Sequence, residues 1–224
     1  MLKILVKYPT RQRPELFLKT LQAYIDKADN NNYIEYLVSY DSDDESMNTE
    51  VINKALVMHP NIFCKKGFSD SKIHACNRDV NEFHKPWDII LLVSDDMHVQ
   101  QKGWDTFIRE KMEKYYPDTD GCLWLHDGSK QKVISTLSCI GKKYYDRFGW
   151  IYNPKYKSFF CDNEYTDVAK SFNKITFIDE VIIKHEHPQW GGGVKHDALY
   201  ERNNGPWEHD GNLYRSRKSK SEIA

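Results

Sequence analysis

The 224-residue sequence contains no apolar run that approaches the length of a membrane span, which takes about 20 residues. Its first six residues are too few, and too soon followed by polar residues, to form a secretory signal peptide. We therefore expect a soluble, intracellular protein of the cytoplasm without a membrane span.

The sequence also lacks a cysteine pattern and a charge imbalance. Its 5 cysteines show no CxxC spacing and are odd in number, which disfavours a zinc ribbon and a disulfide framework, so we expect reduced, mostly buried thiols. The 32 Lys and Arg residues nearly balance 33 Asp and Glu residues, for a net charge of −1. No overall electrostatic field would draw such a chain to nucleic acid or to a membrane.

Alternating strand and helix patterns are present instead. This order predicts an α/β fold with a mostly parallel central sheet and flanking helices. The predicted strands are 3–7, 33–40, 61–65, 89–93, 121–126, 133–140 and 175–183, and the predicted helices are 16–25, 46–58, 69–83, 102–115, 142–148 and one that begins at Asp162.

Polar side chains follow three strands of the first half. Residues 10–13 follow the first strand, Asp41 follows the second, and Asp95 and Asp96 follow the aliphatic run 89–93. The carboxyl ends of parallel strands meet at one edge of a sheet, where α/β proteins bind ligands. Adjacent carboxylates are costly without a cation between them, and a hard divalent cation is the usual solution. The sequence therefore predicts one shared site that holds such a cation.

The chain resembles a glycosyltransferase of the GT-A (nucleotide-diphospho-sugar transferase) fold, and is similar to the large inverting, family 2-like group that includes bacterial polysaccharide synthases. The resemblance covers residues 3–187. It rests on Thr10-Arg11-Gln12-Arg13-Pro14, on Asp41, on Ser94-Asp95-Asp96 in the DXD place, on Asp162-Asn163-Glu164 in the later acidic place, and on the histidine after the final strand.

This resemblance implies a nucleotide-sugar donor, with a UDP-sugar favoured, and a divalent metal, Mn²⁺ or Mg²⁺. Asp96 would bind the metal directly, Asp95 would bind the metal or the ribose, and His185 would be a further ligand, with His187 and His196 as competitors. The sequence departs from the DXD pattern because Ser94 stands where the first acid is expected. The division of labour between the two aspartates is therefore open at this point.

The remaining donor contacts and the catalytic base are assigned in the same way. Asp41 would accept a hydrogen bond from the base or ribose. Asp162 is the first choice, and Glu164 the second, for the base that would activate an acceptor hydroxyl. The reaction would be a single displacement with inversion. The alternative for Asp162 is an ordinary helix N-cap. The candidate donor-binding residues are Thr10, Arg11, Arg13, Asp41, Asp43, Lys72, Asn77 and Asp95.

The resemblance also suggests a division of the chain. Residues 1–190 would form the glycosyltransferase domain, with a nucleotide-sugar-binding half over 1–116 and an acceptor half over 117–190. Residues 191–224 contain few aliphatic residues and end in a basic tail, so we expect a loop-rich extension with a disordered end. The hydroxyl acceptor would be a glycan, a small molecule or a modified DNA base contacted by that tail.

Three other functions compete with this one. A metallohydrolase is disfavoured because the chain has no HExxH motif. A nucleotidyltransferase is disfavoured because no glycine lies between Pro9 and Pro14, after the first strand. A non-catalytic sugar-binding module would explain the abundant aromatic residues, but not three strands that end in polar, acidic residues.

Overall fold

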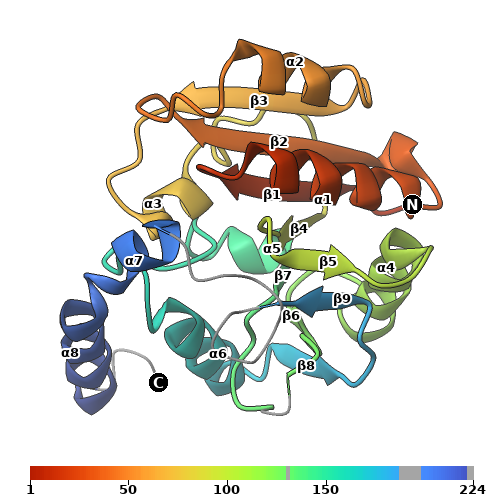
Figure 1. The fold of residues 1–224 in the computed structure, drawn as a ribbon. Coiled ribbons are helices and arrows are strands. Elements are labelled where there is room, and N and C mark those ends of the chain that lie inside the picture. Colours follow the sequence, from red (N-terminus) through yellow and green to blue (C-terminus); the bar gives the residue numbers. More distant parts are fainter. Residues whose placement is uncertain (130–131, 187–197, 221–224) are drawn as a thin grey trace.

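The computed structural model describes residues 1–129, 132–186 and 198–220. Its main sheet has 7 strands in the order β3-β2-β1-β4-β7-β6-β8 (Figure 1). The first four strands in that order are parallel, while β7 is antiparallel to both of its neighbours, so the predicted α/β fold with a mostly parallel sheet is confirmed. The strands are β1 (Ile4–Thr10), β2 (Ile34–Asp41), β3 (Ile62–Gly67), β4 (Ile89–Leu92), β6 (Cys122–Leu125), β7 (Ser138–Gly141) and β8 (Ile175–Ile178).

Helices cover both faces of this sheet because side chains alternate between faces along each strand. On β1, Ile4, Val6 and Tyr8 pack in one core cluster with residues of α1, α2 and α4, and Leu5 packs in another with residues of α3, α5 and α6. The helices are α1 (Pro14–Asp26), α2 (Thr49–Leu56), α3 (Lys72–Asn77), α4 (Trp104–Tyr115), α5 (Lys142–Tyr145), α6 (Cys161–Ser171), α7 (Ala198–Asn204) and α8 (Trp207–Ser219), with a 3₁₀ turn η1 (Asn31–Tyr33).

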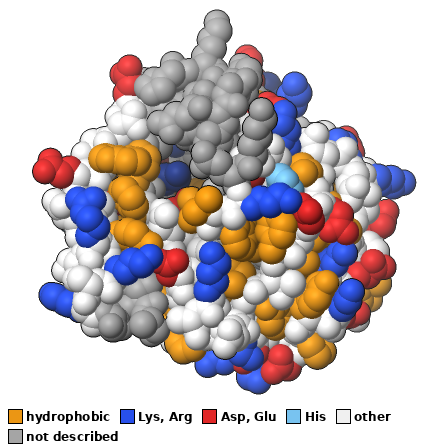
Figure 2. Space-filling view, turned by 90° about the horizontal axis from the view of Figure 1, so that it is seen from below, with side chains coloured by type: hydrophobic (Ala, Val, Ile, Leu, Met, Phe, Trp, Pro, Cys, Tyr) orange, Lys and Arg blue, Asp and Glu red, His pale blue; other side chains and the backbone are white. Residues whose placement is uncertain are grey.

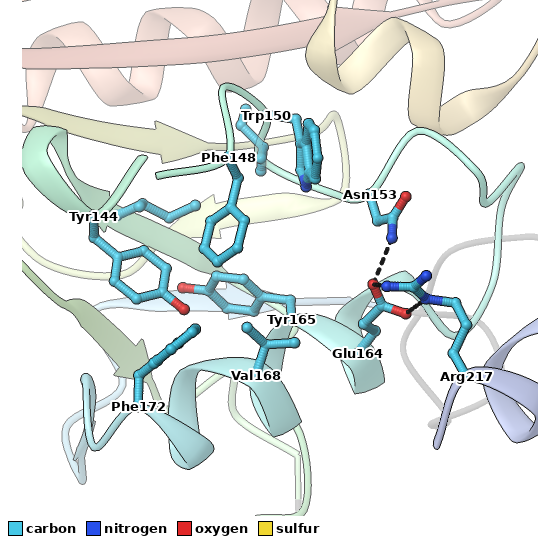
Figure 3. Close-up of a pocket in the computed structure, with 11 residues that line it drawn as sticks. Tyr144, Phe148, Trp150, Asn153, Glu164, Tyr165, Val168, Phe172 and Arg217 are labelled. Atoms are coloured by element: carbon cyan, nitrogen blue, oxygen red, sulfur yellow. Dashed lines mark hydrogen bonds and ion pairs between the residues drawn. The ribbon is translucent and has the colours of Figure 1, made fainter. Parts of the chain in front are cut away.

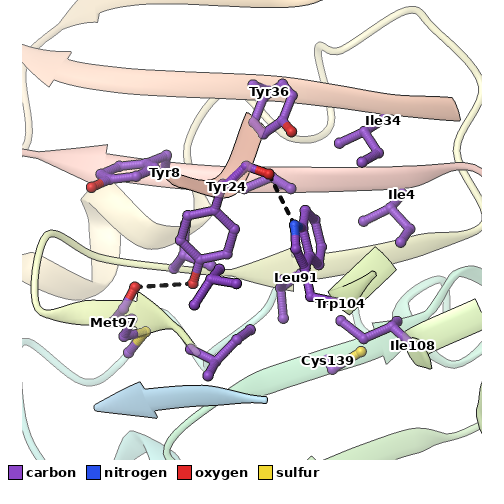
Figure 4. Packing of buried hydrophobic residues seen from close by; sticks show 14 of the residues in the cluster. Ile4, Tyr8, Tyr24, Ile34, Tyr36, Leu91, Met97, Trp104, Ile108 and Cys139 are labelled. Atoms are coloured by element: carbon purple, nitrogen blue, oxygen red, sulfur yellow. Dashed lines mark hydrogen bonds between the residues drawn. The ribbon is translucent and has the colours of Figure 1, made fainter. Parts of the chain in front are cut away.

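Two aromatic side chains of the first cluster hold the chain that follows β4 (Figure 4). The rings of Tyr24 and Trp104 meet edge to face at 5.3 Å, and the Trp104 indole N–H donates to the Tyr24 carbonyl at 2.9 Å. The Tyr24 hydroxyl donates in turn to the carbonyl of Met97 at 3.1 Å. α1 and α4 therefore fix the backbone immediately after Asp96.

The structure corrects several predicted boundaries. The single strand expected over 175–183 is two strands, β8 and β9 (Ile183–His185), because the exposed Asp179 and Glu180 interrupt it. β9 pairs antiparallel with β5 (Met97–Val99) in a separate 2-stranded sheet. The helix expected over 69–83 is limited to α3, because Arg78 is extended and Asp79 has a left-handed φ of 72°.

The C-terminal region differs most from its prediction. Residues 198–219 form helices α7 and α8 where loops and a disordered tail were expected, and α8 lies beside α6 in Figure 1. The rest of the predicted extension, 191–197 and 221–224, lies outside the described residues. Arg217 and Lys218 of the basic tail form ion pairs with Glu164 and Asp167 of α6, which explains why this polar sequence is helical. Among the described residues, no helix is long and apolar enough to cross a membrane. The 5 cysteines are free thiols, and all except the half-buried Cys64 are buried.

Candidate active site

A cleft of about 240 Å³ opens at the carboxyl ends of β1, β2 and β4. These strand ends meet there because the strands are parallel neighbours. Most of the residues predicted for the site line this cleft, from both halves of the chain. They are Thr10, Arg11, Arg13, Asp41, Lys72, Asp95, Asp96, Asp162 and His185.

Asp95 and Asp96 contact different partners. The Thr10 hydroxyl lies 3.2 and 3.3 Å from the two carboxylate oxygens of Asp95. Burial, followed by the nearby charge of Asp96, raises the pKa of Asp95 to about 7. The Asp96 carboxylate instead accepts a hydrogen bond from Ser94 and lies 3.6 Å from Nε2 of His185. Ser94, two residues before Asp96, therefore holds the Asp96 carboxylate in place.

His185 reaches this cleft through the small β5–β9 sheet. The strand register places His185 opposite Met97, next to Asp96. The N–H of Glu186 donates to the Asp96 carbonyl at 2.8 Å, and the N–H of His185 donates to the Asp127 carbonyl at 2.9 Å. The backbone thus fixes the approach of the two side chains. The competing candidates His187 and His196 lie outside the described residues.

The donor chemistry of Asp96 and His185 suits a divalent metal that is shared with a substrate. Within the part of the chain that the structure describes, no group of three or more His, Cys, Asp or Glu side chains is arranged to hold an ion alone. Asp95 is therefore not joined with the other two in one ligand set. Magnesium sites at phosphates commonly use only one or two carboxylates, and the substrate supplies the other oxygens. The pair of Asp96 and His185 fits a metal bound together with a diphosphate.

Arg11 and two acids form the rim of the cleft beyond β2. The Arg11 guanidinium donates to Asp41 at 2.8 Å and to Asp43 at 2.6 and 3.0 Å. The guanidinium lowers the pKa of Asp43. Asp41 is buried, and its second carboxylate oxygen lies 3.9 Å from the Arg78 guanidinium without a hydrogen bond. This oxygen is buried and accepts no hydrogen bond, whereas Arg11 is engaged with the acids.

Lys72 and Asp162 face the same cleft from α3 and α6. Burial raises the pKa of Asp162, although the charges of Lys72 and His185 act in the opposite direction. The Lys72 side chain is accessible within the cleft. Burial works to lower its pKa, but the neighbouring Cys161 and Cys76, followed by Asp96 and Asp162, raise it overall. Asp162 is the second residue of α6, so the N-cap alternative does not hold; Phe160 occupies the cap.

Three other predicted site residues lie outside the cleft wall. Asn77 donates to the Tyr152 carbonyl at 2.6 Å and accepts from two backbone N–H groups, so it holds the loop before α6. Asp43 is half-exposed and holds Arg11.

Glu164, the third of them, faces a second cavity, of about 140 Å³, on another side of α6 (Figure 3). There it accepts hydrogen bonds from Asn153 at 2.6 Å, Tyr156 at 2.7 Å and Arg217 at 2.7 Å. The structure therefore does not bring Glu164 together with Asp162.

Sequence reasoning missed part of the cleft wall. The loop before α6 contributes Lys157, Ser158 and Phe159, and the C-terminal helices contribute Leu199, Arg202, Asn203, Asn204 and Pro206. The available signal was the spacing of Asp210, Tyr214, Arg217 and Lys218, which places them along one helical face. Apolar periodicity does not mark this helix, because few of its residues are apolar.

Comparisons with known proteins address the fold. No family model matches the sequence, and no curated protein sequence matches it. Solved structures do match. A mannosyltransferase from Pyrobaculum calidifontis, in complex with GDP-Man and Mn²⁺, superposes with a TM-score of 0.65 at 14% identity over 85% of this chain. The chain has the GT-A-like glycosyltransferase fold.

A second glycosyltransferase structure agrees. Residues 1–349 of TarS from S. aureus, in complex with UDP-GlcNAc, superpose with a TM-score of 0.63 at 14% identity over 89% of this chain. The chain spans 59% of the mannosyltransferase and 64% of that TarS fragment. It is thus shorter than both structures it resembles.

Proposed function

We propose that this chain transfers a sugar from a nucleotide-diphosphate donor to a hydroxyl acceptor. The observation that carries the proposal is the convergence of Asp41, Asp96, Asp162 and Lys72 on one cleft at the strand ends of a GT-A-like sheet. The similar structures were solved with GDP-Man and Mn²⁺ and with UDP-GlcNAc, which supports a nucleotide-sugar donor. A UDP-sugar is the favoured donor.

Different residues of the cleft contact different parts of the donor. Asp41, which lines the cleft, accepts a hydrogen bond from the nucleobase or ribose, and Thr10 and Asp95 adjoin the ribose. Arg13 lines the cleft beside these residues and contacts the donor phosphates. Asp96 and His185 would hold Mn²⁺ or Mg²⁺, which would supply positive charge to stabilise the departing diphosphate.

Asp162 acts as the general base. It takes the proton of the acceptor hydroxyl while that oxygen attacks the anomeric carbon, and the nucleoside diphosphate leaves from the opposite face with inversion. A raised pKa suits this role, because a carboxylate of higher pKa binds the transferred proton more firmly. Lys72 faces the same cleft and keeps its proton, so it balances the negative charge that develops on the leaving phosphate.

A glycan or small-molecule acceptor is favoured over modified DNA. Two cations of the C-terminal tail, Arg217 and Lys218, are bonded to acids of α6. The face seen in Figure 2 mixes basic and acidic side chains and shows no continuous basic patch among its described residues. A DNA-binding surface needs clustered cations to neutralise phosphates.

Calorimetry with UDP and MnCl₂ tests the proposal. Wild type should bind UDP with Mn²⁺, and Asp96→Ala should weaken that binding by about 10- to 100-fold, the range typical of disturbed metal sites. Asp118→Ala is the matched control, because Asp118 is an exposed partner of Lys143 and lies outside the cleft wall. Absence of binding to UDP, GDP and other nucleoside diphosphates would overturn the donor assignment. UDP binding by wild type that EDTA leaves undiminished would overturn the metal assignment.

A further inference from the structure

Asp210 is a fully buried carboxylate in the C-terminal helix α8. It accepts hydrogen bonds from three successive backbone N–H groups, those of Lys157 at 3.1 and 3.2 Å, Ser158 at 2.7 Å and Phe159 at 2.8 Å. Its other contact is with Nδ1 of His209 at 2.9 Å. The loop at 157–159, which is distant from Asp210 in the sequence, is therefore held by hydrogen bonds to this one carboxylate.

These bonds are strong enough to determine the shape of the loop. Burying a carboxylate costs several kcal/mol unless it is hydrogen-bonded, so the fold retains it only where donors surround it. Hydrogen bonds to an ionised acceptor are roughly twice as strong as neutral ones. Successive backbone N–H groups that converge in this way form a concave anion site, which here is filled by the protein's own carboxylate.

The bonded loop joins two residues of the proposed active site. Residues 157–159 line the cleft themselves. The carbonyl of Lys157 accepts a hydrogen bond from Ile73 at 3.2 Å, immediately after Lys72. At its other end the loop passes through Phe160, whose φ is 58°, into α6 and Asp162. The loop is thus a physical link between the two helices that carry Lys72 and Asp162.

We propose that Asp210 is a positioning residue that holds residues 157–159 and so sets the geometry between Lys72 and Asp162. Its role in catalysis rests on the proposed function, whereas its hold on the loop does not. A misplacement of about 1 Å costs about 100-fold in rate when it separates reacting groups. Loss of the carboxylate should therefore lower turnover. Nucleotide binding should persist, because it uses the ends of the sheet strands and not this loop.

The alternative is that Asp210 merely docks α8. Asp167 provides the comparison, because it also joins α8 to α6, through Tyr214 at 2.6 Å and Lys218 at 2.8 Å. Both partners of Asp167 belong to α8 and neither belongs to the loop at 157–159, and Asp167 lies outside the cleft wall. Asp167→Asn therefore weakens docking of α8 while it leaves the bonded loop intact.

Hydrogen exchange of the full chain tests the structural part. In Asp210→Asn, exchange of the amides of Lys157, Ser158 and Phe159 should accelerate at least about 10-fold, whereas Asp167→Asn should leave these amides protected. Unchanged protection in Asp210→Asn, or equal loss in both variants, would overturn the proposal. If Asp210→Asn fails to fold, Asp210→Glu takes its place, because the longer side chain keeps the charge and displaces the loop.

Kinetics test the catalytic part, with release of UDP from UDP-GlcNAc or UDP-glucose in Mn²⁺ as the reaction. Asp210→Asn should lower kcat by about 10- to 100-fold and change the Kd of UDP less than about 3-fold. Asp167→Asn should keep both values. A wild type without UDP binding or turnover would contradict the proposed function, and exchange would still decide whether Asp210 holds the loop. Loosened amides with undiminished turnover would overturn the positioning role.

Discussion

The two walls of the cleft are built in different ways. One wall consists of strand ends of the parallel half, where each acid follows directly from a buried strand. The other consists of the loop at 157–159 and the starts and ends of helices, held by side chains from the last part of the chain. The first wall depends on local sequence order, and the second depends on tertiary contacts.

This difference has a functional meaning. The strand-end wall carries Asp41 and Asp96, which we assign to the donor and its metal. The helical wall carries Lys72 and Asp162, which we assign to the chemical step. Changes in the first wall should therefore affect binding, and changes in the second should affect turnover. Substitutions in and around the two walls can break that separation or sharpen it.

Asp162→Asn should have the largest effect. Removal of a general base typically costs about 100- to 10,000-fold in rate, and the amide keeps the shape of the side chain. We expect kcat for UDP-sugar turnover to fall by that amount, with the Kd of UDP nearly unchanged. Steady-state kinetics and calorimetry measure the two quantities. A drop in nucleotide affinity equal to the drop in kcat would break the proposed separation of the walls.

Glu164→Gln should show the opposite pattern, although Glu164 is only two residues away. The side chains of Glu164 and Arg217 are 6% and 15% exposed, so the change removes a negative charge beside a largely buried guanidinium. Such losses cost about 3–5 kcal/mol of unfolding free energy. Urea unfolding should detect this destabilisation, while turnover per folded molecule stays within a few-fold of wild type. A loss of turnover comparable to that of Asp162→Asn would identify Glu164 as the base.

Lys7→Met tests the burial of β1, the strand that leads to the first wall, through the pH dependence of stability. Lys7 is fully buried on β1, donates a hydrogen bond to Ser39, and has a pKa lowered to about 7, mainly by burial. The folded protein therefore binds fewer protons than the unfolded chain between about pH 7 and the ordinary lysine pKa of 10.5, so this residue makes stability rise with pH in that window. The slope from this group is at most about 1.4 kcal/mol per pH unit.

The measurement for Lys7 is urea unfolding of wild type and Lys7→Met at several pH values from about 6 to about 10. Below about pH 7 the methionine variant should have a higher free energy of unfolding than wild type. This difference should shrink as pH rises. Parallel stability curves for the two proteins would contradict the assigned pKa.

Trp207→Ala should have the smallest effect. Trp207 is 56% exposed and lies at 4.7 and 5.0 Å, between ring centres, from Phe159 and Phe160. Aromatic pairs of this kind contribute about 0.5–1.5 kcal/mol each. We expect a modest fall in melting temperature and a turnover loss smaller than that of Asp210→Asn. A larger kinetic effect would show that the rings, and not the Asp210 carboxylate, hold the loop.

The sequence predicted the first wall because strand, turn and helix follow one another there. A continuous aliphatic run is typical of a strand buried on both faces, and in this chain it stops at Asp95 and Asp96. The sequence did not distinguish the roles of the two acids, since these depend on Thr10 and His185, which only the folded sheet brings near them. The metal assignment itself remains a prediction.

The second wall could not be predicted for a related reason. The partners of Asp210 are backbone N–H groups, which every sequence contains and which no residue pattern marks. Likewise α8 is helical although its apolar residues are few, because ion pairs and ring contacts with α6 and the loop before it replace an apolar stripe. The sequence ranks Asp162 before Glu164 as the base but does not place them at separate sites, although residues two apart on a helix point to different sides.

The small β5–β9 sheet has a consequence for how the molecule is assembled. Its register pairs Met97 with His185, and these two residues belong to segments that are far apart in the sequence. The four parallel strands can form among nearby segments, but Asp96 meets its histidine only after the chain has closed this long loop. Formation of such distant contacts is slow because loop-closure entropy must be overcome first. The contact between Asp96 and His185 should therefore be among the last to form during refolding.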